Sequence, residues 1–137
     1  MLYPASRNFL RYLLWADAIS CLACGLLQLA LGDPLSQLFS LPAGLLFDTG
    51  VFLLVYGAAV AALAMPARAP GAIVWVLIVG NIGWGVAAVG ILVAGDVHPT
   101  LLGKAYIVVQ ALTVLILADL QYFAVRRSRS DRLASAE

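Results

Sequence analysis

The stretch AIVWVLIVGNIGWGVAAVGILVA at residues 72–94 has no charged side chain along its 23 positions. A helix needs about 20 predominantly apolar residues to cross the hydrocarbon core of a bilayer, so this stretch is long enough to span one. Apolar and polar residues do not alternate with a period of two, which excludes a strand of a transmembrane β-barrel. Because lipid offers the backbone no hydrogen-bond partners, the stretch predicts a transmembrane helix.

Three more apolar stretches of similar length occur along the chain, at residues 9–31, 45–65 and 101–125. Glycine, proline and aspartate separate the four stretches, as is typical of turns. Apolar residues make up 64% of the 137 residues and charged residues 11%, against about 45–50% and about 25% in soluble domains. The sequence therefore predicts an all-α, four-helix transmembrane bundle, with a single domain at residues 1–125. The same composition excludes a soluble enzyme with a large polar cleft, and a nucleic-acid-binding protein with a basic surface.

The basic residues are distributed unevenly between the two predicted sides of the membrane. One side, which holds both termini, carries Arg7, Arg11, Arg68, Arg126, Arg127, Arg129 and Arg132. The other side carries only Lys104. Cytoplasmic segments are enriched in Lys and Arg, so we expect both termini to be cytoplasmic and residues 126–137 to form a basic cytoplasmic tail. The small size and the Ala, Leu, Gly and Val content favour a bacterial inner membrane.

Two of the predicted spans carry small residues at helical spacing. Helices in lipid associate through close backbone packing and interhelical hydrogen bonds, and small residues permit that packing. The third span has Gly80, Gly83, Ala87 and Gly90 along one face, and the second span has Gly50 and Gly57. These six residues are the predicted helix-packing positions. The pattern favours packing within the bundle and leaves contact with another subunit as the alternative.

Several polar residues fall within the predicted spans. Asp17, Cys21, Cys24 and Gln28 share one face of the first span, because they are spaced by four, three and four residues. Asn81 and Gln110 lie near the middle of the third and fourth spans. We expect Asp17, Asn81, Gln110 and Gln28 to form an intramembrane polar cluster that faces the bundle interior. Two interpretations are open: a hydrogen-bonded cluster that only supports the fold, or a site where Asp17 carries a proton or binds a cation.

The cysteine spacing in the first span is that of a Cys-x-x-Cys pair. Cys21 and Cys24 would suit a membrane thiol oxidoreductase linked to a quinone, but their position near the middle of the membrane disfavours a thiolate. We retain this redox function as the weaker alternative. The chain has one histidine, His98, and no motif for a nucleotide or a catalytic metal. No cofactor, metal or catalytic residue is therefore predicted, whereas a bound lipid is compatible with the sequence.

The sequence YLLWAD at residues 12–17 places an acid in the first of four short spans. In this it resembles the small multidrug resistance transporters, which carry a membrane Glu at a comparable point and bind protonated drugs or guanidinium compounds as dimers. The resemblance covers about one helix. Long linkers at 32–44 and 95–103 depart from that family, as does an arginine asymmetry that opposes dual-topology insertion. The hydropathy profile alone is similar to that of small four-helix bacterial proteins of the DoxX-like type.

These observations predict a small, polytopic membrane protein and favour a binding function over an enzymatic one. Besides the lipid bilayer, the partner would be another membrane protein, a second copy of the chain, or a lipid-like molecule held among the helices. The alternative is a small proton-coupled transporter that uses Asp17.

Overall fold

The computed structural model describes residues 5–66 and 70–136, and in these segments the regular structure is entirely helical. The helices are α1 (Ala5–Ala30), α2 (Gly32–Phe39), α3 (Ala43–Ala64), α4 (Gly71–Ala94) and α5 (Leu101–Ala134). All except α2 are long and apolar enough to cross a membrane, which confirms the prediction of four long apolar helices. The helix α5 continues into the basic tail as far as Ala134. Arg68, which contributes to the predicted charge asymmetry, lies outside the described residues.

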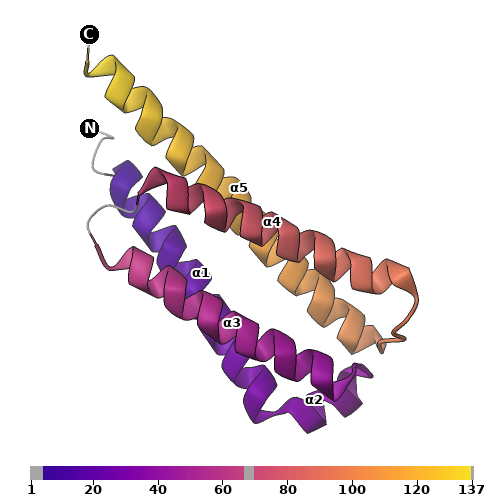
Figure 1. Cartoon of the computed structure of the whole chain (residues 1–137). Coiled ribbons are helices and arrows are strands. Elements are labelled where there is room, and N and C mark those ends of the chain that lie inside the picture. Colours follow the sequence, from indigo (N-terminus) through magenta and orange to yellow (C-terminus); the bar gives the residue numbers. More distant parts are fainter. Residues whose placement is uncertain (1–4, 67–69, 137) are drawn as a thin grey trace.

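The four long helices form two antiparallel hairpins. Helix α1 packs along α3, α4 packs along α5, and the two hairpins meet mainly where α1 contacts α5. Helix α1 begins and α5 ends at the same end of the molecule, which we call the terminal end (Figure 1). The short helix α2 lies at the opposite end, which we call the α2 end.

Glycines allow α1 and α3 to approach closely. A Cβ atom at Gly25 of α1 would lie 2.8 Å from the carbonyl oxygen of Gly50 in α3. At Gly57, about two turns further along α3, a Cβ atom would lie 2.9 Å from Cγ of Leu22 and 3.1 Å from the carbonyl oxygen of Ala18. The distances of 2.8 and 2.9 Å are too short for a Cβ atom, so Gly25 and Gly57 set the separation of these two helices.

Helix α2 is an amphipathic helix of 8 residues, about two turns, in a segment that the sequence predicts to be a linker. Its apolar residues Leu35 and Phe39 are buried, and they pack against Leu46 of α3 and Ile107 of α5. The ring of Phe39 stacks on Tyr106, with 4.7 Å between the ring centroids. Burial of these side chains fixes α2 across the end of the bundle.

Thr100 joins the start of α5 to the end of α2. Its side-chain oxygen accepts a hydrogen bond from the backbone N–H of Gly103 at 3.1 Å, as an N-cap residue does. The same hydroxyl donates to the carbonyl oxygen of Leu38 at 2.8 Å, and the Thr100 backbone N–H donates to that of Phe39 at 2.9 Å. These bonds satisfy carbonyl groups at the end of α2 that the helix itself leaves open.

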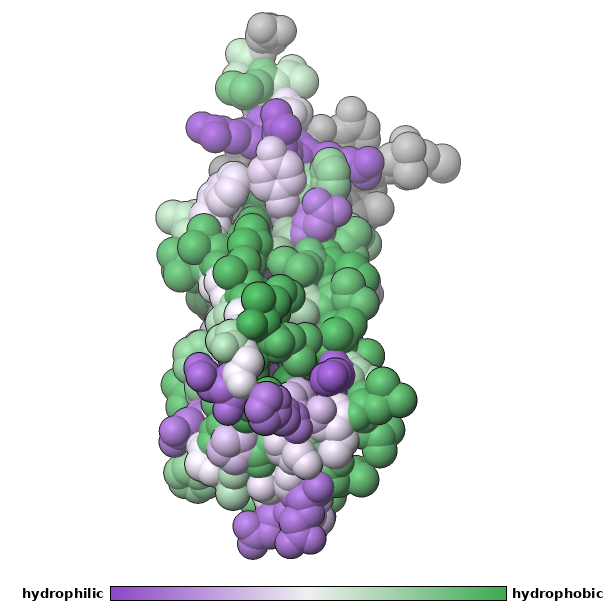
Figure 2. Space-filling view, turned by 90° about the vertical axis from the view of Figure 1, so that its right-hand side faces the viewer, coloured by the Kyte–Doolittle hydropathy of each residue, from purple (hydrophilic) through white to green (hydrophobic). Residues whose placement is uncertain are grey.

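Aromatic side chains contribute to the contact between α3 and α4. Phe52 of α3 stacks on Trp84 of α4 with 5.2 Å between centroids, and Phe52 also stacks on Tyr56 at 6.0 Å. On the face shown in Figure 2, hydrophobic side chains form a band across the middle, with hydrophilic side chains above and below it. This distribution is the one expected for a protein whose middle part faces acyl chains.

Candidate functional site

Asp17 is the centre of a polar cluster in the interior of the bundle. Its side chain is 0% exposed. The oxygen Oδ2 accepts hydrogen bonds from Nδ2 of Asn81 in α4 at 3.0 Å and from Nε2 of Gln121 in α5 at 3.1 Å. The oxygen Oδ1 accepts a hydrogen bond from Sγ of Cys21, one turn further along α1, at 3.6 Å. The carboxylate therefore links three helices.

Tyr56 brings the remaining long helix into the same network. Its hydroxyl donates to Oδ1 of Asn81 at 3.2 Å, and Nδ2 of Asn81 also donates to Oε1 of Gln121 at 3.5 Å. Asn81 and Gln121 are 2% and 0% exposed. We call the five residues Asp17, Cys21, Tyr56, Asn81 and Gln121 the Asp17 cluster. Because all four long helices contribute to it, the cluster fixes their relative rotation.

The chemistry of the Asp17 cluster is that of an acceptor surrounded by neutral donors. Each hydrogen bond that the described residues give to the carboxylate comes from an uncharged group: a thiol or one of two amides. Both amide bonds go to Oδ2, and the only side chain that bonds to Oδ1 among the described residues is the thiol of Cys21. The partners of the Asp17 side chain in the described part of the chain are thus neutral hydrogen-bonding groups, and none is a cationic side chain.

Gln28 and Gln110, which the sequence analysis assigns to the cluster around Asp17, belong to a second one. Nε2 of Gln28 and Nε2 of Gln110 donate to the hydroxyl oxygen of Tyr106 at 2.7 and 2.8 Å. The hydroxyl of Thr49 donates to Oε1 of Gln28 at 2.9 Å. We call Gln28, Thr49, Tyr106 and Gln110 the Gln28 cluster. It lies nearer the α2 end, so the expected single cluster is in fact two.

The spacing of these residues along α1 and α5 explains why there are two clusters. It also explains the position of Gln121, which was not among the predicted site residues. Gln28 follows Asp17 by 11 residues in α1, and Gln121 follows Gln110 by 11 residues in α5. Eleven residues are about three helical turns, so each pair shares one face of its helix. Because α1 and α5 run antiparallel, Asp17 meets Gln121 and Gln28 comes near Gln110. The matching spacing in the two helices was the available signal.

The two cysteines are free, with Cys21 buried and Cys24 partly buried. The thiol of Cys21 is engaged with Asp17. In this arrangement Cys21 acts as a small buried donor, as a structural cysteine does.

The two stripes of small residues differ in their surroundings. Gly50 and Gly57 are buried against α1. In contrast, the residues Gly80, Gly83, Ala87 and Gly90 of α4 are exposed, and at Gly83 and Gly90 a Cβ atom would have no heavy atom within 4 Å among the described residues. The α4 stripe was expected to pack against another helix of the bundle. In the structure this face of α4 points outward. Helix α4 instead turns Asn81, about 100° away from Gly80, toward the interior.

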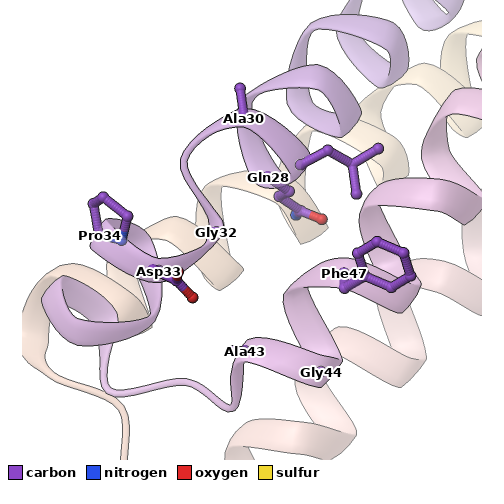
Figure 3. A pocket seen from close by; sticks show the side chains of 9 residues that line it. Gln28, Ala30, Gly32, Asp33, Pro34, Ala43, Gly44 and Phe47 are labelled. Carbon is purple, nitrogen blue, oxygen red and sulfur yellow. The ribbon is translucent and has the colours of Figure 1, made fainter.

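Two pockets open at the ends of the bundle. The first has a volume of about 450 Å³ and lies between α1, α2 and the start of α3. Figure 3 shows Asp33 and Phe47 on either side of it, with Gln28 above and between them in this view. The second has a volume of about 330 Å³ and lies at the terminal end, between Trp75 of α4 and the last turns of α5.

The chain was compared with protein-family models, curated proteins and solved structures, and none of them matches it.

Proposed function

We propose that the chain is a multi-pass membrane protein without enzymatic activity that binds an amphipathic, lipid-like molecule at the α2 end. The observation that carries this proposal is the pocket between α1, α2 and α3, which at about 450 Å³ is within the usual size of small-molecule sites. Leu29, Ala30 and Phe47 give it apolar walls, and Asp33 gives it a carboxylate. An apolar chain with a cationic headgroup fits this combination.

The polar groups in the interior support a binding function over catalysis. The Asp17 cluster is closely packed and its members are hydrogen-bonded to one another. Such a cluster stabilises one arrangement of helices and leaves the surface pockets as the places where another molecule can bind. A lipid-like ligand would reach the pocket directly from the bilayer.

The proposed location of the protein is a bacterial inner membrane, with both termini in the cytoplasm. At the terminal end, Arg11, Arg126, Arg127 and Arg129 belong to the first turns of α1 or the last turns of α5. Asp33, Asp96 and Lys104 belong to the segments at the α2 end. This distribution supports the orientation given by the excess of basic residues.

Replacement of Asp33 with asparagine tests the pocket. We expect D33N to bind dodecylamine about fivefold more weakly than the wild type. The loss of one ion pair at the protein surface lowers an affinity by this order of magnitude. Binding is measured as the fraction of protein that carries the amine in native mass spectrometry, with dodecanol as the uncharged comparison.

Asp48 offers a matched control, because it is exposed near the same end and does not line the pocket. D48N should bind dodecylamine as the wild type does, and F47A should bind both dodecylamine and dodecanol more weakly. An equal loss in D33N and D48N would attribute binding to general surface charge and would contradict the pocket.

A proton-coupled transporter is the second candidate, and the chemistry of Asp17 favours it. A buried carboxylate whose described partners are all neutral is suited to exchange a proton for a cation if α3 and α4 part. Only side-chain contacts such as those of Tyr56 with Asn81 and Phe52 with Trp84 close that seam. Separation of α3 from α4 would admit water to Asp17.

The transporter candidate predicts that Asp17 is required for coupled flux. Proteoliposomes are loaded with guanidinium, and proton uptake driven by its outward gradient is followed with a pH-sensitive dye inside. We expect the wild type to take up protons and D17N to show no flux above empty liposomes. D119N, which alters an exposed carboxylate of α5, serves as the control and should retain the flux. Equal flux in D17N and the wild type would eliminate this candidate.

A further inference from the structure

The pocket at the terminal end combines basic, aromatic and apolar side chains. Arg126 and Arg129 lie one turn apart on α5, and both line the pocket together with Ser130. Trp75, in the first turns of α4, forms the opposite wall. The remaining lining is contributed by α5, on the side that faces α4. We call this pocket the terminal groove.

Aromatic contacts hold Arg126 in position. Its Nη1 donates to the hydroxyl oxygen of Tyr122 at 3.1 Å, and its Cζ lies 5.6 Å from the centroid of the Tyr122 ring. The Tyr122 ring is itself in edge contact with Trp75, with 5.6 Å between centroids. A guanidinium has more N–H donors than a single tyrosine hydroxyl can accept, so donors of Arg126 remain for a ligand. The side chain is thus oriented before any ligand binds.

Arg129 adds a second guanidinium on the same face of α5. Residues three apart on a helix are neighbours on its surface. Two guanidinium groups are donors that proteins use for phosphate, because the planar fork of Arg matches two phosphate oxygens. The hydroxyl of Ser130 donates to the backbone carbonyl oxygen of Arg126 at 3.3 Å, so the arginines carry the donor set. The donor set of the terminal groove therefore selects a phosphate group.

The position of the terminal groove along the bundle indicates where that phosphate comes from. The apolar stretch of α5 ends at Val125, directly before Arg126, and α4 begins at Gly71, four residues before Trp75. Trp and Tyr side chains at such positions lie at the headgroup level of a bilayer. The apolar wall made by Trp75 and Val125 continues into the hydrophobic part of both helices. A phospholipid can place its phosphate between the arginines and its chains along this wall.

We propose that the terminal groove binds one anionic phospholipid, with Arg126 and Arg129 holding its phosphate and Trp75 and Val125 contacting its glycerol and the upper part of its chains. This site is separate from the pocket at the α2 end in place and in charge. The proposal therefore stands or falls independently of the proposed function, and the two are tested with different lipids and different variants.

The test compares R129Q with R127Q in the full chain purified in a mild detergent. Arg127 is exposed on the same helix and does not line the groove, so its replacement removes the same charge from the neighbouring surface. Phosphatidylglycerol and phosphatidylcholine are added separately, and bound lipid is counted by native mass spectrometry. We expect the wild type to retain phosphatidylglycerol in preference to phosphatidylcholine. We expect R129Q to bind phosphatidylglycerol about tenfold more weakly and R127Q to bind it unchanged, as the loss of a charge-assisted hydrogen bond requires.

Further arms separate the remaining explanations. R129K keeps the charge and loses the planar fork, so it should bind with an affinity between those of R129Q and the wild type. Millimolar inorganic phosphate should not displace the lipid; displacement would identify a site for free phosphate and overturn the lipid assignment. An equal loss in R127Q and R129Q would show attraction by diffuse charge and would overturn the groove. Circular dichroism of each variant confirms that the helices are retained.

Discussion

Replacement of Asp17 with leucine is expected to lower the free energy of unfolding by about 2–4 kcal/mol, because two buried amides lose their acceptor. Leucine has the same branching as aspartate, with two bulkier methyl groups in place of the oxygens, so the change removes the hydrogen bonds without opening a cavity. Nδ2 of Asn81 and Nε2 of Gln121 would face an apolar side chain in a region that admits no water. Interhelical hydrogen bonds in membranes average about 0.6 kcal/mol, and three of them give a loss near the lower end of this range.

Replacement of Asp17 with asparagine is expected to change the same free energy by less than about 1 kcal/mol. Asn81 and Gln121 both donate to one oxygen of Asp17, and the carbonyl oxygen of an asparagine can occupy that position. Its amide would then point at Sγ of Cys21, which can accept a weak hydrogen bond after its proton rotates away. The asparagine variant thus separates the hydrogen bonds of Asp17 from its charge.

Reversible unfolding in mixed detergent micelles, followed by the helical circular dichroism signal, measures both effects. Asp119 is exposed on α5, so D119L is the control and should leave stability unchanged. Wild-type stability in D17L would contradict the role given to the Asp17 cluster in holding the hairpins together. A large loss in D17N together with D17L would assign the stabilisation to the charge of Asp17.

The four long helices and the inward orientation of Asp17 and Asn81 could be predicted from the sequence, because hydropathy and the cost of an unpaired polar group in lipid act locally. Gln121 could not be assigned to Asp17 from its own span, since it lies only four residues before the predicted end at 125. Its partner depends on how far α5 extends and on which helix lies opposite. Those are properties of the assembled bundle.

Helix α4 illustrates a competition between two local signals. Its stripe of small residues and its single amide lie on different faces, and apolar side chains surround both. A small-residue face permits close packing, but a buried hydrogen bond relieves the larger penalty of an unpaired amide. The fold satisfies Asn81 and leaves the glycines of the stripe outside. The sequence pattern alone did not reveal which signal would prevail.

Helix α2 was missed for a different reason. Eight residues are too few to span a membrane, and the pattern of glycine and proline around it is also that of a loop. Leu35 and Phe39 are spaced for one face of a helix, but two residues are weak evidence for a helix on their own. Their burial depends on a surface that α3 and α5 create together. A short helix of this kind is defined by its tertiary contacts.

Replacement of Gly25 with leucine is expected to lower the free energy of unfolding by about 3 kcal/mol or more, at the upper end of the effect of overpacking. A Cβ atom at this position would already lie 2.8 Å from the carbonyl oxygen of Gly50, and a backbone atom cannot move aside as a side chain can. The only relief is to move α3 away from α1, which would also separate Gly57 from Leu22 and Ala18. The loss therefore extends along the whole contact between these helices.

Gly83 gives the matched control, because a Cβ atom there would have nothing within 4 Å in the described part of the chain. Leucine has a higher helix propensity than glycine by up to about 1 kcal/mol, so G83L should be as stable as the wild type or slightly more stable. Unfolding of both variants is measured in the same micelles. If G25L retained wild-type stability, α1 and α3 would have to be further apart than in this structure. If G83L lost as much stability as G25L, the face of α4 would have to be packed against another molecule, since Gly83 is exposed and a Cβ atom there meets no described neighbour within 4 Å.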